Sequence, residues 1–255
     1  MRRMGRKHLL LVILVLCLAL PATAGLAADR FILLAGTGWE TEGCIADSGQ
    51  PGPVALILGG VHGSEPAGAL AAAQVCTFQP VTGKIVVVPR VNRPGLAAKL
   101  RYVPNGGGDM NRVYPPRDVA TPAERMGAAI IALMEEHRVR LFVDLHEARN
   151  FHKIDPSSLG QSLLPADNLA SDAMATAAIE AVNREIDEEV KMFTRLGPPI
   201  RRSAAWYAGK YLGVAAFTVE TSGQQPLADR VGQHLAVVKE LLMTGGWLAR
   251  PQKDH

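Results

Sequence analysis

A histidine and a glutamate stand three residues apart in a turn after a short apolar run. The run ends at two glycines, which let the backbone fold tightly, and His62 and Glu65 follow. Their imidazole nitrogen and carboxylate oxygen could point at one metal ion. His146 follows a second apolar run and offers a third donor. Two histidines and a carboxylate, with a fourth position left to water, are a ligand set of catalytic zinc, so we expect one Zn2+ per chain.

Three polar residues could support this centre or a substrate. Arg112 has a planar, permanently charged guanidinium that suits a carboxylate, and Asn111 beside it adds a neutral amide, so the two could hold a substrate's free carboxyl group. Asp144 lies two residues before His146 and would point to the same side of a strand. Its carboxylate could accept a hydrogen bond from the ligand imidazole.

Four short motifs occur in the order in which a known enzyme family carries them. A single His-x-x-Glu is common by chance, whereas four motifs in this order are specific. The chain from about residue 53 to 222 resembles the zinc carboxypeptidase superfamily, and within it the aspartoacylase and succinylglutamate desuccinylase branch. The motifs are Gly60-x-His62-Gly63-x-Glu65, Asp109-x-Asn111-Arg112, Asp144-Leu145-His146 and Thr218-Val219-Glu220-Thr221.

The resemblance implies roles for two more residues. Glu220 matches the family's glutamate that takes a proton from the zinc-activated water and passes it to the leaving nitrogen. Arg101 stands where the family tends to have an arginine that stabilises the oxyanion, although a solvated loop cation is an equal alternative. Glu147 competes with Glu220 for the role of base because it follows His146. Neighbouring residues on an extended segment point to opposite sides, which favours Glu220.

These features predict a zinc-dependent hydrolase that cleaves an amide bond next to a free carboxylate of a small molecule or peptide. Metallocarboxypeptidase and N-acyl amino acid deacylase both remain open, and export would bring cell-wall peptides within reach. Peptide-cleaving members of the family have a tyrosine about twenty residues before the base. Here residues 196–200 lack one, and Tyr207 or Tyr211 either substitutes or packs. The alternative of another class is a non-catalytic module that binds a peptide or acyl amino acid in the same cleft.

The first residues have the layout of a secretory signal peptide. A basic start is followed by an apolar run over residues 9–20 and by small residues up to position 28. We expect residues 1–28 to be removed and the protein to be periplasmic or extracellular, without membrane association. An uncleaved anchor is the alternative, although the apolar run is shorter than the roughly 20 residues that a membrane-spanning helix needs.

Net charge and cysteine content bear on the binding partners and on the possible disulfide. Removing the signal takes away four basic residues and no acid, so the formal charge changes from 27 − 24 = +3 to 23 − 24 = −1. With no basic patch, this argues against a nucleic-acid partner. Cys44 and Cys76 remain, and in an oxidising compartment either a disulfide or two separate thiols is open. The oligomeric state has no signal in the sequence.

Apolar runs alternate with amphipathic stretches over residues 29–255, which predicts a single α/β domain. We expect a mixed, mostly parallel sheet with helices on both faces. The expected strands are 31–35, 54–58, 84–89, 141–145, 190–194 and 215–219, and the expected helices are 66–76, 122–136, 169–189, 203–211 and 226–243. Residues 36–52 are expected to form a hairpin or loop, and 90–120 and 147–168 long polar loops.

The remaining histidines are expected to lie away from the metal. His137, His234 and His255 are predicted on helix surfaces or in the tail, whereas His152, in the loop after His146, could contact a substrate.

Overall fold

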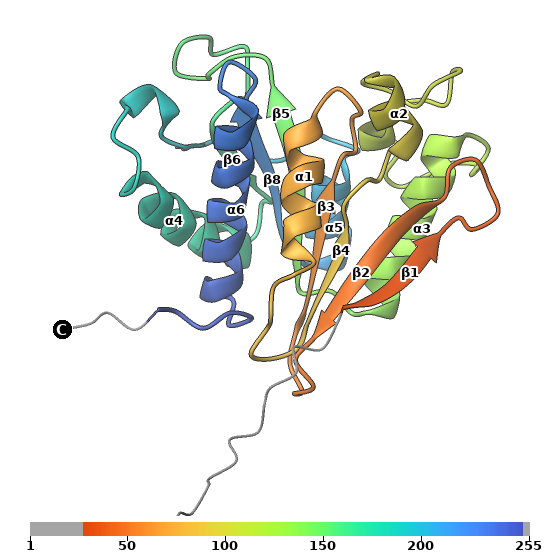
Figure 1. The fold of residues 1–255 in the computed structure, drawn as a ribbon, viewed down its shortest axis with the longest axis horizontal. Coiled ribbons are helices and arrows are strands. Elements are labelled where there is room, and N and C mark those ends of the chain that lie inside the picture. Colours follow the sequence, from red (N-terminus) through yellow and green to blue (C-terminus); the bar gives the residue numbers. More distant parts are fainter. Residues whose placement is uncertain (1–27, 252–255) are drawn as a thin grey trace, which may run out of the picture.

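The computed structural model describes residues 28–251 as one eight-stranded sheet with helices on its two faces (Figure 1). The strand order is β1-β2-β4-β3-β5-β8-β6-β7. The strands are β1 (Asp29–Leu33), β2 (Thr41–Asp47), β3 (Val54–Gly59), β4 (Lys84–Val88), β5 (Leu141–Ala148), β6 (Ser162–Pro165), β7 (Thr194–Arg195) and β8 (Ala215–Ser222). The helices are α1 (Pro66–Val75), α2 (Arg93–Ala98), α3 (Pro122–Glu136), α4 (Leu169–Asn183), α5 (Ala204–Leu212) and α6 (Leu227–Thr244), with 3-10 helices η1 (Met110–Arg112) and η2 (Glu189–Lys191).

The four central strands are parallel, and antiparallel strands flank them. Parallel pairing joins β4 to β3, β3 to β5, and β5 to β8, whereas β2 and β6 pair antiparallel to this core. Nearly every residue of the central strands is buried, as apolar strands covered on both faces require. The predicted α/β class is confirmed, with its mixed, mostly parallel sheet.

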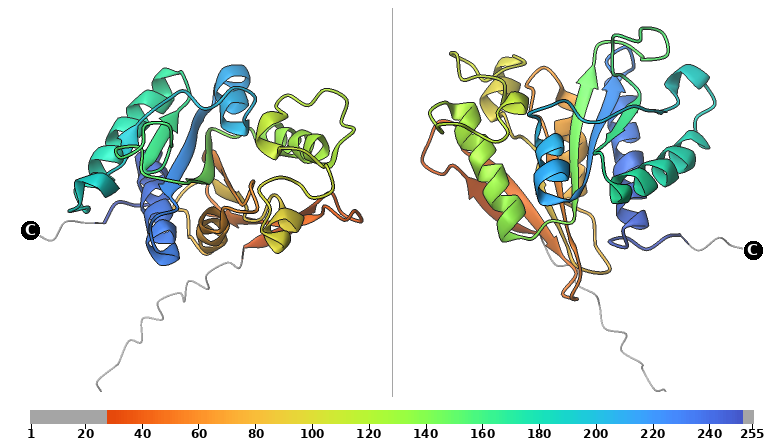
Figure 2. Two further views of the ribbon diagram at one scale, coloured as in Figure 1. Left: turned by 90° about the horizontal axis from the view of Figure 1, so that it is seen from above. Right: turned by 180° about the vertical axis from the view of Figure 1, so that it is seen from behind.

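A layer of helices covers each face of the sheet (Figure 2). Helices α1, α4 and α6 pack on one face, where their side chains share a core with Val143 and Phe217. Helices α3 and α5 share the core of the other face with Phe142 and Ala216. Successive side chains of a strand alternate between the faces. This alternation decides which residues at the strand ends reach the site described below.

The start of α3 follows its sequence signals. The Thr121 side chain accepts a hydrogen bond from the Glu124 N–H at 3.2 Å, and the Glu124 carboxylate accepts one from the Thr121 N–H at 3.2 Å. Pro122 occupies the first helical position, where a missing N–H costs nothing. This reciprocal pair fixes the helix start that the sequence predicts.

Several predicted boundaries are wrong because short elements hide inside polar stretches. β2 lies within 36–52 and pairs antiparallel with β1, which confirms the hairpin expected there, whereas β6 lies within 147–168 and the excursion 90–120 holds α2 and η1. The helix predicted over 169–189 ends at Asn183. The Phe193 N–H donates a hydrogen bond to Asn183 Oδ1 at 2.7 Å. The strand predicted over 190–194 is instead η2 followed by the two-residue β7.

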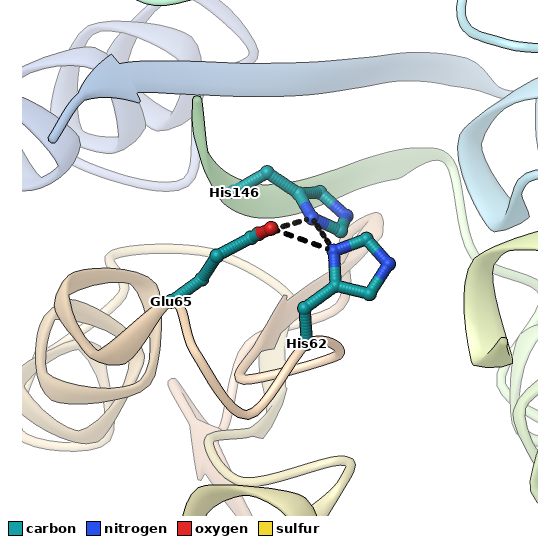
Figure 3. Close-up of side chains that lie close together, drawn as sticks. All are labelled: His62, Glu65 and His146. Atoms are coloured by element: carbon teal, nitrogen blue, oxygen red, sulfur yellow. Dashed lines mark hydrogen bonds and ion pairs between the residues drawn. The ribbon is translucent and has the colours of Figure 1, made fainter. Parts of the chain in front are cut away.

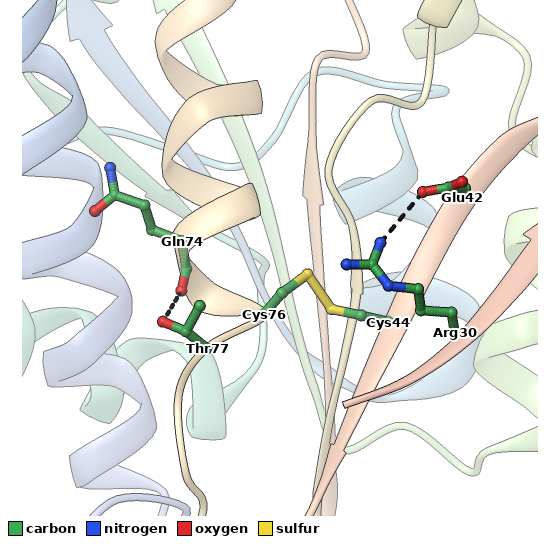
Figure 4. Close-up of a disulfide and its surroundings, with 6 residues drawn as sticks. All are labelled: Arg30, Glu42, Cys44, Gln74, Cys76 and Thr77. Carbon is green, nitrogen blue, oxygen red and sulfur yellow. Dashed lines mark hydrogen bonds and ion pairs between the residues drawn. A yellow bond between two sulfur atoms is a disulfide. The ribbon is translucent and has the colours of Figure 1, made fainter. Parts of the chain in front are cut away.

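A disulfide joins Cys44 of β2 to Cys76, which follows the last turn of α1 (Figure 4). Their Cα atoms are 6.0 Å apart and 32 positions separate them in sequence. Of the two states that the sequence leaves open, the structure has the disulfide. The bond ties the helix layer to the antiparallel edge of the sheet.

None of the helices within residues 28–251 combines the length and apolar character needed to cross a membrane. The predicted signal segment lies outside the described residues, except for its last position, and stays a prediction.

Candidate metal centre and active site

The three predicted metal ligands converge at the carboxyl ends of neighbouring strands (Figure 3). His62 and Glu65 lie in the turn after β3, and His146 lies near the end of β5. His62 Nδ1 is 2.9 Å from Glu65 Oε1, and His146 Nδ1 is 2.9 Å from Glu65 Oε2. The two Nδ1 atoms are 3.2 Å apart, and one donor atom from each residue falls within a span of 4.8 Å. All three side chains are buried.

Glycines shape the turn that carries two of these ligands. Gly60 has a φ of +66°, in the left-handed region that favours glycine. A Cβ on Gly63 would come within 2.0 Å of the Gly95 carbonyl carbon, so the turn packs directly on the α2 backbone. The turn leads into α1, whose N-cap residue is Glu65. The Glu65 side chain makes no cap hydrogen bond, which leaves its carboxylate aimed at the two histidines.

The outer nitrogen of each histidine faces a carboxylate. His62 Nε2 is 3.2 Å from Asp109 Oδ1, and His146 Nε2 is 2.9 Å from Asp144 Oδ2. Asp144 is fully buried, and neither of its oxygens has a hydrogen-bond partner of good geometry among the described residues. Carboxylates behind ligand imidazoles fix the ring orientation and the tautomer. Asp144 lies beside His146, as the sequence predicts. The sequence places Asp109 in a family motif but does not predict its position beside His62.

Electrostatics at the centre favour a cation. Burial acts to raise the pKa of the Glu65 carboxyl, but hydrogen bonds from His146 and His62 outweigh it and lower that pKa to about 2. Burial acts to lower the pKa of His146, yet the charges of Asp144 and Glu65 raise it well above its usual value. The same carboxylates that favour positive charge on the imidazole would favour a divalent cation between the rings. Two imidazole nitrogens and a carboxylate oxygen at this spacing fit zinc.

Glu220 stands beside the third ligand. In the parallel pairing of β5 and β8, Glu220 is the register partner of His146, so the two side chains leave the same face of the sheet. Burial raises the pKa of the Glu220 carboxyl to about 7, while the neighbouring charge of His146 acts in the opposite direction. A carboxyl group with a pKa near 7 can both accept and return a proton at neutral pH.

Glu147 has a different set of contacts. Its carboxylate accepts a hydrogen bond from the Ala67 N–H of α1 at 2.5 Å and forms an ion pair with Arg230 of α6. Its own N–H donates to Glu65 Oε2 at 3.1 Å. Glu147 therefore supplies the capping contact at α1 that Glu65 does not make. This arrangement agrees with the choice of Glu220 over Glu147 as the candidate base.

The three predicted substrate-handling residues line one cavity of about 310 Å³ together with the metal ligands and Glu220. Arg101 contacts the Glu65 carboxylate. Arg112 donates to the Asn111 carbonyl at 2.6 Å, and Asn111 is buried with its Oδ1 accepting from the Ala204 N–H at 3.3 Å. Arg202 donates to the Arg112 carbonyl at 2.9 Å, a clamp that sequence reasoning did not find.

Other expectations are settled by packing. Within the described part of the chain, no tyrosine lines the cavity, and Ile200 does so instead. Tyr207 stacks on Tyr211 with ring centroids 5.2 Å apart, so the two tyrosines pack rather than substitute. The surface position predicted for His234 is wrong, because α6 turns this residue fully into the core. Burial lowers the pKa of His234 to about 3, and its Nε2 lies 3.2 Å from Thr221 Oγ1.

Comparison with known proteins agrees with the geometry. Residues 51–243 match the Succinylglutamate desuccinylase/Aspartoacylase catalytic domain. The chain belongs to this family. Its relatives include amide-bond hydrolases. The N-alpha-acetyl-L-2,4-diaminobutyric acid deacetylase of Halomonas elongata is 37% identical over 67 residues, which are 25% of this chain and 20% of that protein.

Solved structures of other proteins share the fold. Helicobacter pylori Csd4, a D,L-carboxypeptidase in its mDAP-bound form, matches with a TM-score of 0.71 at 23% identity, over 77% of this chain and 51% of that chain. The product-bound Ectoine utilization protein EutE (DoeB) of Ruegeria pomeroyi matches with a TM-score of 0.66 at 21% identity, over 89% of this chain and 70% of that chain. The chain thus spans about half of Csd4 and matches a fifth of the deacetylase.

Proposed function

We propose that this member of the family is an exported, zinc-dependent hydrolase that cleaves an amide bond beside a free carboxylate. The observation that carries the proposal is the convergence of His62, Glu65 and His146 beside the buried Glu220 on the wall of one cavity. A metallocarboxypeptidase and an N-acyl amino acid deacylase both use this chemistry. The relative from Halomonas elongata is a deacetylase, and the structural neighbour Csd4 is a D,L-carboxypeptidase.

Each residue has a task in the proposed reaction. His62, Glu65 and His146 would hold a zinc ion, which would supply a Lewis acid and lower the pKa of the attacking water toward about 7. Glu220 takes the proton from the attacking water and later gives it to the leaving nitrogen. Its burial supports this task, because a carboxyl group with a pKa of about 7 exchanges protons readily near neutral pH.

Two arginines are proposed to bind the substrate, and two aspartates to orient the histidines. The Arg112 guanidinium binds the substrate carboxylate in a bidentate manner. Arg101 has five N–H donors, more than its contact with Glu65 uses, and these can stabilise the oxygen that becomes negative during attack. Asp109 and Asp144 lie 3.2 and 2.9 Å from the outer nitrogens of His62 and His146, and their negative charges favour a proton on these nitrogens, which leaves the Nδ1 atoms for a metal.

The metal content of the mature protein tests the centre. We expect about one zinc per chain in the wild type, none in His62→Ala, and about one in Glu220→Gln, with activity lost in both variants. His137→Ala is the matched control, because His137 is the C-cap residue after α3 and does not line the cavity. Amide hydrolysis is assayed on N-acyl amino acids and on muropeptides, and the cleaved class identifies the substrate type. A protein without metal that stays inactive after zinc is added would indicate a binding module instead.

Export is tested separately. Residues 1–28 fused to a reporter enzyme should carry it out of the cytoplasm, whereas a fusion that begins at residue 29 should not. A reporter that stays inside with both fusions would contradict this part of the proposal.

A further inference from the structure

The loop after β5 supplies a part of the cavity wall that the proposed reaction does not use. Arg149, Asp155 and Ser157 of this loop line the same cavity as the metal ligands and Arg112. The reaction needs one carboxylate site, which Arg112 provides. The loop adds one more cation and one anion to the wall.

Neither of these two charged side chains forms an ion pair with another described residue. Within residues 28–251 the Arg149 guanidinium makes no ion pair or hydrogen bond, and Asp155 makes no ion pair. Asp155 Oδ1 accepts from the Ser157 N–H at 3.0 Å and from its hydroxyl at 2.6 Å, which leaves Oδ2 without a hydrogen bond. The Ser157 hydrogen bonds, and then the charge of Arg149, lower the pKa of the Asp155 carboxyl. Asp155 is thus ionised and lies near Arg149 without touching it.

The loop is built before any ligand arrives. The Ser158 hydroxyl accepts from the Asn150 N–H at 3.0 Å and donates to the Asn150 carbonyl at 2.8 Å. The ring Nδ1 of His152 forms a hydrogen bond with the Ser158 carbonyl at 2.9 Å. The backbone N–H of His152 donates to the Gly160 carbonyl at 2.8 Å. His152, an open candidate for substrate contact, therefore braces the loop and does not line the cavity. A braced loop lowers the ordering cost of binding.

We propose that Arg149 and Asp155 form a second ionic subsite for an α-amino acid head group, which places its carboxylate on Arg149 and its ammonium on Asp155. The inference rests on the proposed function and names its substrate class. A substrate with one carboxylate would pair with Arg112 and would leave both Arg149 and Asp155 without an ionic partner. An amide of a diamino dicarboxylic acid, with two carboxylates and one free ammonium, matches the charges of Arg112, Arg149 and Asp155, none of which forms an ion pair within residues 28–251.

Three peptides that differ only in their C-terminal residue test the subsite. Diaminopimelate carries the full distal head group, lysine the ammonium alone, and 2-aminopimelate the carboxylate alone. We expect the wild type to have the highest kcat/KM for the diaminopimelate peptide. Asp155→Asn keeps an acceptor for Ser157 and should lower kcat/KM about tenfold for the two ammonium-bearing peptides only, as the loss of one charge-assisted hydrogen bond predicts.

Arg149→Gln should lower kcat/KM about tenfold for the two peptides with a distal carboxylate, and Arg149→Lys should restore part of the loss. Equal kcat/KM values for the three peptides, or equal losses in both variants, would overturn the subsite.

Two controls separate this proposal from the proposed function. An N-acyl amino acid without a distal charge should be hydrolysed at the same rate by the wild type and both variants. If none of the three proteins hydrolyses it, the result contradicts the proposed hydrolase function and not only the subsite. Calorimetric binding of free diaminopimelate, lysine and 2-aminopimelate needs no turnover. Affinities that do not follow the same charge pattern would refute the subsite even if the hydrolase is active.

Discussion

The disulfide between Cys44 and Cys76 should raise the free energy of unfolding by an amount that depends on the number of residues between the two cysteines. A bond across 32 positions removes about 12 cal/mol/K of conformational entropy from the unfolded chain, which is ~3.7 kcal/mol at 25 °C. The folded state should change little when the bond is cut. Cys44 stays paired with Val87 in the sheet, and α1 stays packed on β3 and α6. The loss therefore appears in the unfolded state.

Urea unfolding of the metal-free protein measures this effect, because without metal a reductant cannot act through the metal centre. We expect the phosphine-reduced protein to lose about 3–4 kcal/mol of unfolding free energy, or roughly 7–15 °C in Tm for a chain of this size. The variant with both Cys44→Ala and Cys76→Ala should have low stability that reductant does not change. A loss below about 1 kcal/mol, or equal sensitivity of the double variant to reductant, would refute the reasoning.

Three further predictions concern the site. Glu220→Gln should lower kcat by about 10²–10⁴-fold while metal content stays at the wild-type level, as metal analysis and single-substrate kinetics can show. Because burial raises the pKa of Glu220 to about 7 and the base must be ionised, kcat/KM should fall about tenfold per pH unit below about pH 7; a flat profile between pH 5 and 7 would exclude this base. Arg230→Met leaves the Glu147 carboxylate buried without its partner and should cost about 3–5 kcal/mol in urea unfolding, and Glu147→Gln in the same chain should recover part of it.

Local patterns were enough to select the three side chains that meet in the candidate metal centre. His62 and Glu65 are placed by one glycine turn, and His146 and Glu220 each end an apolar strand. Because parallel strands bring their carboxyl ends to one edge, their meeting follows from the fold class. The pairing of β5 with β8, which makes His146 and Glu220 neighbours, did not follow from the sequence, since register depends on contacts between distant segments.

Contacts between layers could not be read from the chain. His234 looked like a surface residue, although its spacing from Val231, Val238 and Leu241 places it on the buried stripe of α6. That spacing was the available signal. The Arg230 ion pair with Glu147 had no comparable signal, because it joins residues 83 positions apart whose contact depends on how α6 crosses the sheet.

The two neighbouring residues at the end of β5 show how one strand serves both layers. His146 faces the α3 and α5 side with Asp144 and Glu220, and its imidazole joins the metal centre. Glu147 turns to the other side, where its carboxylate binds the start of α1 and Arg230 of α6. Since α1 begins directly after Glu65, the geometry of the metal centre depends on both helix layers. Loosening α6 should therefore weaken metal binding although no residue of α6 is a ligand.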